Sequence, residues 1–413
     1  MTEPGAQPVT EPELPNGPIV VVGAGVAGAT AALTLRAEGH TGPITLVGAE
    51  SEHPYRRPPL SKEVLLGSQP TARTLLRPVG SWEGQGVDLA IGRSAVDLDT
   101  EGRKLTLDDG TCLPYDRLLL ATGSRPRRPA FASAGLPGVH ALRTLDDARR
   151  LRGALQDGGR LLVIGAGLIG LEAAAAARAL GVEVTVLEAA PSALGRTLPT
   201  PVAEAVVALH EANGVTVRTG VGVTSLERRR VGGTERLVAG CGDGGEHVAD
   251  AVLLAVGAEP ATELAASAGL AVDDGIVVDA YCATSAPGVW AAGEVTRRPD
   301  AFLGCGIRVE HWTDAQDHGA AAARNMLGRP TAFTALPWAW TQHYGTTVQV
   351  CGYPAVADEG PDGVAIDGDL HAFDFTARLT RAGELVGAVC AGRPAEFRAL
   401  REEVGEATRP ERT

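Results

Sequence analysis

Closely spaced cysteines are missing from this chain of 413 residues. The six cysteines are Cys112, Cys241, Cys282, Cys305, Cys351 and Cys390. None of them forms a C-x-x-C pair, so the usual spacings of zinc sites and dithiol redox centres are excluded. Scattered thiols are typical of a reducing compartment, and we therefore expect a cytoplasmic protein without a metal site.

Long apolar runs, a positive net charge and aromatic residues are also scarce. No segment is apolar for long enough to span a membrane, and no basic segment followed by an apolar one opens the chain. The formal net charge is −13, whereas phosphate backbones are bound by basic faces. We expect neither a membrane nor a nucleic acid as a partner, and a monomer or a weak homodimer.

Glycine, in contrast, is abundant, with 53 residues, and two glycine-rich segments share one pattern. The segments are Gly23-Ala-Gly-Val-Ala-Gly28 and Gly165-Ala-Gly-Leu-Ile-Gly170. Each follows an apolar strand and opens a helix that is followed by a second strand. The predicted elements are a strand at 18–22, a helix at 26–38 and a strand at 44–47, then a strand at 161–164, a helix ending at 180 and a strand at 184–187. This order is typical of the dinucleotide-binding Rossmann unit.

The duplication extends to the closing strands, because the apolar segment at 116–123 is echoed at 250–257. The last part of the chain, after residue 331, alternates apolar and polar residues, as half-buried strands do. There we predict strands at 346–350, 371–379 and 385–389 and a helix at 394–404. The predicted fold is α/β, with two three-layer Rossmann-like domains and a C-terminal α+β domain.

The same patterns predict the division of the chain into domains. We expect tails at 1–16 and 405–413, a discontinuous dinucleotide-binding domain at 17–124 and 251–330, a second dinucleotide-binding domain at 125–250 and the C-terminal domain at 331–404.

The glycines have a chemical role in such units. They permit a tight turn, let a pyrophosphate approach the backbone and allow the helix to pack closely on the strand. The helix N-terminus then favours the negative charge of the pyrophosphate. The residues expected to bind cofactors in this way are Gly23, Gly25, Val26, Ala27 and Gly28 in the first unit and Gly165, Gly167, Leu168, Ile169 and Gly170 in the second.

The acidic residue after the second strand predicts which nucleotide is bound. Glu188 is placed to accept a hydrogen bond from the adenosine 2′-hydroxyl of NADH, and it would repel the 2′-phosphate of NADPH. Glu50 is the corresponding choice in the first unit. The turns after the closing strands, Ala121-Thr122-Gly123 and Gly257, are expected to lie beside the cofactors. Two dinucleotide sites are useful together if one binds FAD and the other NADH, since hydride can then pass between the two rings.

Four further segments carry a family resemblance. They are Tyr55-Arg-Arg-Pro-Pro-Leu-Ser-Lys62, Thr144-Leu-Asp-Asp147, Val289-Trp-Ala-Ala-Gly-Glu-Val295 and Pro337-Trp-Ala-Trp340. With them the chain resembles, from about 18 to 401, the NADH-dependent ferredoxin reductases of oxygenase systems within the glutathione reductase superfamily. The resemblance implies that the discontinuous domain at 17–124 and 251–330 is an FAD-binding domain and that the domain at 125–250 is an NADH-binding domain. It also implies hydride transfer from NADH to FAD, followed by single-electron transfers to a [2Fe–2S] ferredoxin.

The resemblance also implies roles for individual residues. Lys62 would lie near the flavin and pair with Glu172, and Arg57 would approach the FAD pyrophosphate. Gly293 and Glu294 would contact the ribityl chain, although relatives usually carry Asp at the second position. Trp312 would contact the cofactor, and Trp340 (or Trp338) would pack near the flavin and screen it from water. His311 and His343 replace the residues common in relatives, and both could lie near the flavin rim.

The electron acceptor is less constrained. No cysteine precedes Cys112, so the cysteine-based reduction of disulfides or peroxide found in relatives is not expected. Seven arginines could form a basic rim for an acidic ferredoxin: Arg56, Arg73, Arg77, Arg125, Arg127, Arg128 and Arg308. The alternatives are direct reduction of oxygen, a quinone or a small substrate, and a flavin redox sensor resembling the apoptosis-inducing factors.

Overall fold

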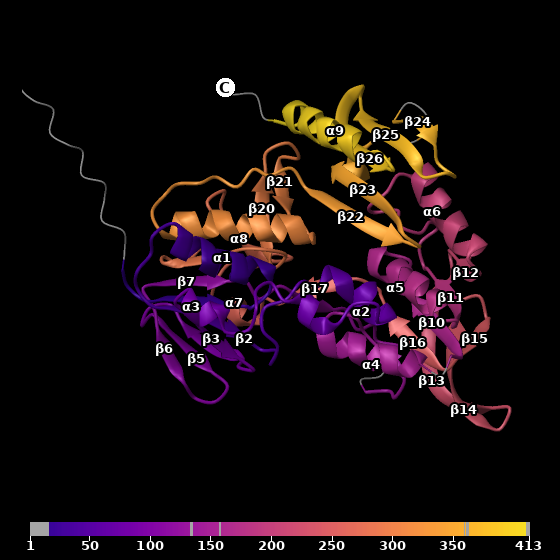
Figure 1. The fold of residues 1–413 in the computed structure, drawn as a ribbon, viewed down its shortest axis with the longest axis horizontal. Helices are drawn as coiled ribbons and strands as arrows, with labels where there is room; N and C mark the ends of the chain where they lie inside the picture. Colours follow the sequence, from indigo (N-terminus) through magenta and orange to yellow (C-terminus); the bar gives the residue numbers. More distant parts are fainter. Residues whose placement is uncertain (1–15, 133–134, 157, 359, 361–362, 410–413) are drawn as a thin grey trace, which may run out of the picture.

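The computed structural model describes residues 16–132, 135–156, 158–358, 360 and 363–409. The chain forms three parts, which we call the first unit, the second unit and the C-terminal unit (Figure 1). The first unit contains the N-terminal segment and the orange segment around α8 (Trp312–Met326). The second unit lies beside it, and the C-terminal unit, drawn in light orange to yellow, lies against one end of the second unit. The predicted tail at 1–16 lies almost entirely outside the described residues.

The first unit is built on a five-stranded parallel sheet in the order β19-β7-β1-β2-β3. Its strands are β1 (Ile19–Val22), β2 (Ile44–Gly48), β3 (Val87–Ile91), β7 (Arg117–Leu120) and β19 (Val289–Ala291). The helices α1 (Val26–Ala37) and α8 pack against each other. Because β19 comes late in the sequence and pairs with β7, the chain leaves this unit and returns to it.

The second unit repeats this construction in the order β12-β11-β10-β16-β9. Its strands are β9 (Val139–His140), β10 (Arg160–Ile164), β11 (Glu183–Leu187), β12 (Val215–Arg218) and β16 (Ala251–Leu254). Its helices are α4 (Leu145–Leu155), α5 (Leu168–Ala179) and α6 (Thr200–Ala212). In both units the helix after the glycine turn stops at a glycine of positive φ, 93° at Gly39 and 81° at Gly181.

The sheet of the second unit bears on the predicted domain division. The division at residue 251 separates β16 from β10, its hydrogen-bonded neighbour in the parallel sheet. Backbone pairing along the whole of β16 holds it in the second unit. We propose that the chain re-enters the first unit after β16, by way of β17 (Ala258–Pro260), which pairs with β8 (Ser124–Pro126) where the two units join.

The C-terminal unit is an antiparallel sheet in the order β22-β23-β26-β25-β24 with one helix on it. Its elements are β22 (Trp338–His343), β23 (Thr346–Gly352), β24 (Val364–Asp369), β25 (Asp374–Arg381), β26 (Glu384–Ala391) and α9 (Pro394–Ala407). Three of these strands and the helix match the sequence prediction, but β22 and β24 were not predicted. The helix α9 also continues to Ala407, so the predicted tail at 405–413 begins with helical residues.

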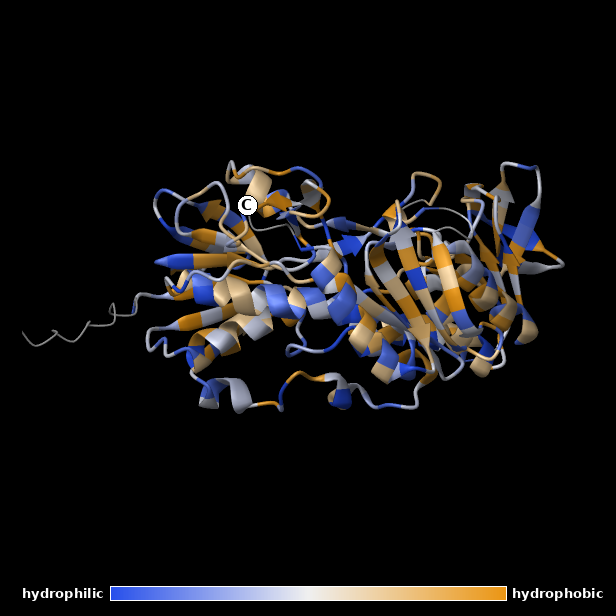
Figure 2. Ribbon diagram, turned by 90° about the horizontal axis from the view of Figure 1, so that it is seen from above, coloured by the Kyte–Doolittle hydropathy of each residue, from blue (hydrophilic) through white to orange (hydrophobic). Residues whose placement is uncertain are grey.

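Short elements complete the fold. The small strands are β4 (Ala95–Asp99), β5 (Lys104–Leu107), β6 (Cys112–Pro114), β13 (Val223–Val231), β14 (Thr234–Cys241), β15 (Glu246–Ala249), β18 (Ile276–Val277), β20 (Thr296–Asp300) and β21 (Cys305–Ile307). The short helices are α2 (Glu63–Leu66), α3 (Ser81–Gly84) and α7 (Glu263–Ser267). Many of the most apolar positions lie in the strands of the larger sheets (Figure 2). Within the described ranges, no helix is long and apolar enough to cross a membrane.

The contact between α1 and α8 generates a prediction. A Cβ atom added at Gly319 of α8 would lie 2.2 Å from the carbonyl oxygen of Ala27 in α1. Gly319→Ala should therefore force the helices apart and lower the free energy of unfolding by about 1–3 kcal/mol. Urea unfolding at equilibrium measures this change.

Gly153→Ala is the matched control, because Gly153 is an exposed residue of α4 and its added Cβ would meet nothing within 4 Å. The methyl group there restricts the unfolded chain and should stabilise the protein by roughly 0.5–1 kcal/mol. Equal effects of the two substitutions would contradict the close helix contact.

Candidate active site

A cavity of about 530 Å³ lies where the three parts of the chain meet. The carboxyl ends of β1, β2 and β7 open into it, which is where ligands bind in open parallel sheets. Leu168, Ile169 and Glu172 of α5 line the same cavity. Trp312 of α8 and Trp340 of β22 complete it. The cavity thus joins the first glycine turn to the helix that follows the second one.

The first glycine turn has the geometry that a bound pyrophosphate requires. Gly23 has a φ of 115°, and a Cβ atom there would lie 2.0 Å from the carbonyl oxygen of Ala121. A Cβ atom at Gly28 would lie 2.0 Å from the carbonyl oxygen of Gly23, whereas one at Gly25 would meet nothing within 4 Å. The outer glycines thus permit close backbone packing, and the middle one leaves open space beside the helix N-terminus.

The second glycine turn repeats this geometry. Gly165 has a φ of 107°, and its added Cβ would lie 2.3 Å from the carbonyl oxygen of Ala255. The space beside Gly167 is again open. Glu188 lies at this turn, where its carboxylate accepts hydrogen bonds of 2.8 Å from the backbone N–H groups of Ala166 and Ala190. The carboxylate is therefore fixed beside the open space.

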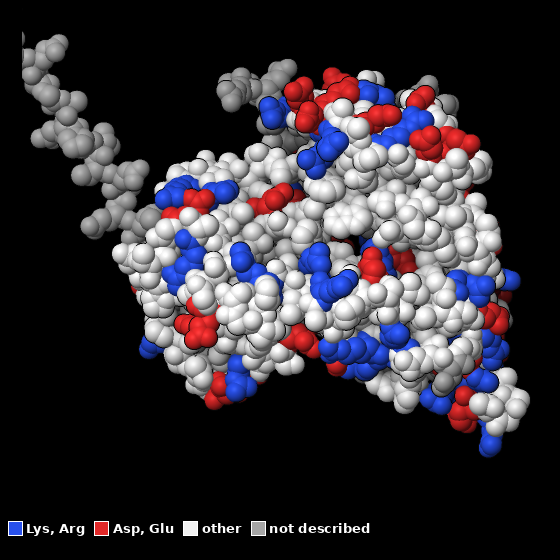
Figure 3. Space-filling view, in the orientation of Figure 1, with Lys and Arg blue, Asp and Glu red and all other residues white. Residues whose placement is uncertain are grey.

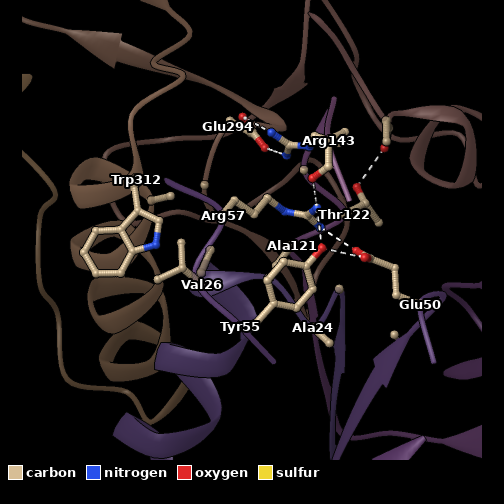
Figure 4. Close-up of a pocket in the computed structure, with 18 of the residues that line it drawn as sticks. Ala24, Val26, Glu50, Tyr55, Arg57, Ala121, Thr122, Arg143, Glu294 and Trp312 are labelled. Carbon is tan, nitrogen blue, oxygen red and sulfur yellow. Dashed lines mark hydrogen bonds and ion pairs between the residues drawn. The ribbon is translucent and has the colours of Figure 1, made fainter. Parts of the chain in front are cut away.

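Glu50 and Arg57 are held together at one side of the cavity (Figure 4). The Arg57 Nη2 atom lies 2.7 Å from Glu50 Oε1, and the Tyr55 hydroxyl donates to Glu50 Oε2 at 2.6 Å. The Arg57 Nη1 atom also donates to the carbonyl oxygen of Arg143 at 2.5 Å. The structure thus brings the predicted ribose and pyrophosphate contacts of the first unit side by side.

Arg143 was missed by the sequence analysis. It forms an ion pair with Glu294, and both side chains line the cavity (Figure 4). Burial, reinforced by the nearby Arg57, lowers the pKa of Arg143 to about 9. The available signal was its place directly before Thr144, the first residue of one of the segments that carry the family resemblance. The pair shows how the longer Glu294 is accommodated, because it reaches across to a cation of the other unit.

Lys62 and Glu172 form a second ion pair across the units, with 2.6 Å between Nζ and Oε2. The two side chains are 13% and 6% exposed, so the pair is largely shielded from solvent. The Ser61 hydroxyl also donates to Glu172 Oε2, at 2.5 Å. The other oxygen, Oε1, accepts from the Thr341 hydroxyl at 2.8 Å and from the backbone N–H of Gln342 at 3.2 Å. One carboxylate thus binds all three parts of the chain.

Several buried polar atoms of the cavity wall have no partner among the described residues. They are His311 Nδ1, Trp312 Nε1 and Arg143 Nε. Buried donors and acceptors are nearly always paired in folded proteins, so a cluster of unpaired ones indicates a missing polar ligand. Together with the open space at Gly25, these atoms fit a cofactor that presents ring and phosphate oxygens or nitrogens.

The remaining predicted residues divide into those in the cavity and those outside it. The lining also includes Val26, Ala27, Ala121, Thr122, Gly123, Gly293 and Glu294. Outside it lie Gly28, Gly165, Gly167, Gly170, Glu188 and Gly257. Of the two tryptophans on β22, Trp340 lines this cavity and Trp338 lines a neighbouring one of about 440 Å³.

His343 also departs from its expected place at the flavin rim. It is 1% exposed and lies outside the cavity lining, because its place on β22 directs it towards α6, where its ring contacts His210. His311, in contrast, does line the cavity. None of the six cysteines does so, and among the described residues no group of three or more potential ligands could hold a metal ion.

The Lys62–Glu172 pair generates a stability prediction. Glu172→Gln leaves the Lys62 ammonium buried without a counter-charge, and this should lower the free energy of unfolding by about 3–5 kcal/mol. Urea unfolding of the cofactor-loaded protein measures it. Adding Lys62→Met should restore much of the loss, because the unpaired charge is then removed as well. Glu246→Gln, at the exposed pair with Arg229, should change stability little. No recovery in the double variant would contradict this account of the pair.

Comparison with known proteins places these features in a family. The family model of the pyridine nucleotide-disulphide oxidoreductases matches residues 17–319, and that of the reductase C-terminal domain matches residues 338–413. The chain is 42% identical, over 81% of its length and 82% of the other protein, to the ferredoxin–NAD(+) reductase component of the anthranilate 1,2-dioxygenase system of Burkholderia cepacia. It is also 42% identical, over 86% of its length and 84% of the other protein, to that component of the biphenyl dioxygenase system of Paraburkholderia xenovorans.

The chain is also similar to a solved structure over nearly its whole length. The reductase in the covalent putidaredoxin reductase–putidaredoxin complex superimposes with a TM-score of 0.89 at 33% identity, over 95% of this chain and 94% of that one. The α/β fold with two dinucleotide-binding units and a C-terminal unit, predicted from the sequence, is confirmed. The chain belongs to the pyridine nucleotide-disulphide oxidoreductase family, and its residues 338–413 match the reductase C-terminal domain.

Proposed function

We propose that the protein is an NADH-dependent FAD oxidoreductase that passes electrons from NADH to a [2Fe–2S] ferredoxin serving an oxygenase. The observation that carries this proposal is the single cavity shared by the first glycine turn and by α5, the helix of the second glycine turn. Two dinucleotides bound at these turns would meet there. The reductase components to which the chain is similar support the identity of the acceptor.

We assign the first unit to FAD. The open space at Gly25 and the N-terminus of α1 suit the pyrophosphate, and Glu50 suits the ribose hydroxyls while Arg57 fixes its carboxylate. The unpaired atoms of His311, Trp312 and Arg143 lie where further polar atoms of FAD would need partners. Bound FAD accepts two electrons as hydride and releases them singly to the acceptor.

We assign the second unit to NADH. The open space at Gly167 and the N-terminus of α5 suit its pyrophosphate, and the fixed carboxylate of Glu188 suits the 2′-hydroxyl of its adenosine ribose. Ile169 is 45% exposed at the cavity, which leaves an apolar surface for the nicotinamide ring. With these two sites, the first unit, to which the chain returns after β16, is the proposed FAD-binding domain, and the second unit, which includes β16, is the proposed NADH-binding domain.

The chain's own residues prepare the cavity for charge. Lys62 brings a positive charge to its wall, where negative charge arrives with hydride, and Glu172 holds the ammonium in place. Trp312 and Trp340 lie with their ring centroids 6.3 Å apart, edge to face, and limit access of water. The absence of cysteine from the lining leaves the acceptor to take electrons without a thiol intermediate.

Charge at the surface fits a protein acceptor only in part. Arg125 pairs with Glu259 and Glu263, and Arg308 pairs with Asp274 and Glu310, so these two arginines are neutralised within the chain. The others of the predicted rim, Arg56, Arg73, Arg77, Arg127 and Arg128, form no ion pair with the described residues. Figure 3 shows basic and acidic side chains close together around the hollow near the centre of the molecule. We therefore restrict the proposed basic rim to the unpaired arginines.

The cysteines also bear on the compartment. All six thiols are free, which is the usual state in the reducing cytoplasm, where NADH is available. We propose a cytoplasmic location.

The proposed function has a direct test. The purified protein should carry FAD, NADH should bleach the flavin absorbance without oxygen, and the bleached protein should reduce a [2Fe–2S] ferredoxin from a dioxygenase system in stopped-flow mixing. Faster reoxidation by oxygen or a quinone than by any ferredoxin would favour the alternative of a small-molecule acceptor. A bleached protein that neither ferredoxin nor oxygen reoxidises on the time scale of stopped-flow mixing would favour a redox sensor.

Glu188 generates a second test, on the nucleotide. Glu188→Ala removes a charged hydrogen-bond partner worth about 1.5–3 kcal/mol, so KM for NADH should rise roughly 10- to 100-fold with little change for NADPH. Steady-state reduction of ferricyanide measures both constants. Glu183→Ala, at the exposed start of the same strand, is the matched control and should leave both unchanged. A similar rise for both nucleotides would contradict a role for Glu188 in recognising the 2′-hydroxyl.

A further inference from the structure

A continuous chain of hydrogen bonds runs from the Lys62–Glu172 pair to the surface. The Thr341 hydroxyl lies 2.8 Å from Glu172 Oε1 and 3.0 Å from His343 Nε2. His343 Nδ1 lies 3.2 Å from His210 Nε2, and His210 Nδ1 lies 3.2 Å from the Tyr344 hydroxyl. The proposed cavity chemistry uses neither histidine.

The chain is buried along its length and ends where solvent begins. His210 is 0%, His343 1% and Thr341 3% exposed, whereas Tyr344 is partly exposed in the tight turn between β22 and β23. The rings of His343 and Tyr344 both meet the His210 ring edge to face, with centroids 5.0 and 5.1 Å away. Three elements therefore form a fixed path that does not pass through the cavity mouth: α5, β22 and α6.

The hydrogen bonds of this chain allow only one orientation when Glu172 is ionised. A carboxylate can only accept, so Thr341 must donate to it and its oxygen must accept from His343 Nε2. A neutral His343 then accepts at Nδ1 from His210 Nε2, and His210 accepts at Nδ1 from the Tyr344 hydroxyl. Every donor therefore points from the surface towards Glu172, as transfer of a proton from group to group requires.

The surroundings of the two rings keep them neutral. Burial, with the neighbouring His343 ring, lowers the pKa of His210 to about 3. Burial, with the positive charge of Lys62, lowers the pKa of His343 to about 4. At the outer end, burial raises the pKa of Tyr344 to about 12, and the positive charge of Arg178 acts against this rise. Neutral imidazoles accept at one nitrogen and donate from the other, so each can pass a proton without holding a charge for long.

We propose that Tyr344, His210, His343 and Thr341 form a proton relay that carries a proton between solvent and Glu172 as the redox state of the cavity changes. The inference rests on the proposed function, which brings hydride into the cavity that Lys62 lines. Hydride carries one proton and two electrons, so the cavity gains one negative charge when NAD+ leaves. One proton moving inward along the relay protonates Glu172 and offsets this charge.

The balance closes when the electrons leave. Two one-electron acceptors remove two electrons and no protons, so two protons must then leave the cavity. The relay returns the proton that it brought, which restores its original tautomers, and the proton that came with hydride leaves through the cavity mouth. One proton is released for each NADH oxidised by two ferredoxins.

The test measures the proton directly. Anaerobic stopped-flow reduction of the FAD-loaded protein in weak buffer with a pH indicator should show, in the natural protein, proton uptake that keeps pace with flavin bleaching. Tyr344→Phe removes the outer hydroxyl at a partly exposed turn, and His343→Gln replaces a ring that can pass protons by an amide that cannot. Each should slow uptake at least about tenfold relative to bleaching, since positioned proton transfer contributes roughly 10²- to 10⁴-fold.

Matched controls separate a relay from a structural role. Tyr353→Phe and His40→Gln alter a tyrosine and a buried histidine outside the relay and should leave uptake unchanged. The slope of the flavin reduction potential against pH should be the same in Tyr344→Phe and His343→Gln as in the natural protein, because Glu172 can still be protonated at equilibrium. In Glu172→Gln the slope should fall, because the acceptor is lost.

The outcomes distinguish the relay from the proposed function. The relay would be overturned if both relay variants took up protons as fast as the natural protein, with unchanged unfolding midpoints. Flavin bleaching without proton uptake in the natural protein would overturn it too. Photoreduction with deazaflavin supplies electrons without NADH. Because no proton then arrives with hydride, two protons are taken up for each reduced flavin, and the relay carries one of them. Slow uptake in the variants under photoreduction, in a protein that NADH does not bleach, would retain the relay and refute the NADH reductase.

Discussion

The buried carboxylate of Glu172 holds the three parts of this protein together at the cavity. It accepts from Lys62 and Ser61 of the first unit and from Thr341 of the C-terminal unit, while its own helix belongs to the second unit. A carboxylate at 6% exposure is stable only when such donors surround it, so the position of each part depends on the other two. The cavity exists because these parts are fixed there.

The other contacts across the units follow from this arrangement. Arg143 of the second unit pairs with Glu294 of the first, and its carbonyl oxygen accepts a hydrogen bond from Arg57. The wall therefore combines paired charges with buried atoms that have no partner in the described chain, such as His311 Nδ1 and Trp312 Nε1. Paired groups give the cavity its shape, and the unpaired ones leave room for the polar atoms of a cofactor.

The repeated glycine turns were predictable because their chemistry is local. The positive φ of Gly23 or Gly165, and the close contact of Gly28 or Gly170 with the carbonyl oxygen of that glycine, involve residues five apart in the sequence. The two strand–turn–helix units therefore appear in the sequence almost as they fold. The partnership of Lys62 with Glu172 came from resemblance to relatives. Arg143 was missed, and His343, which could have lain near the flavin rim, lies outside the cavity lining. Both side chains are placed by contacts with residues far away in the sequence.

The sequence by itself determined two dinucleotide-binding units and a C-terminal unit of different pattern, and it predicted Glu188 as the contact to the ribose of NADH. These features depend on residue spacing, which the chain carries directly. Only the tertiary structure decided that β16 stays with the second sheet, that Arg143 neutralises Glu294, and that two histidines from different units form one path to Glu172. Such pairings depend on how separate units pack, and no local pattern encodes the distance between them.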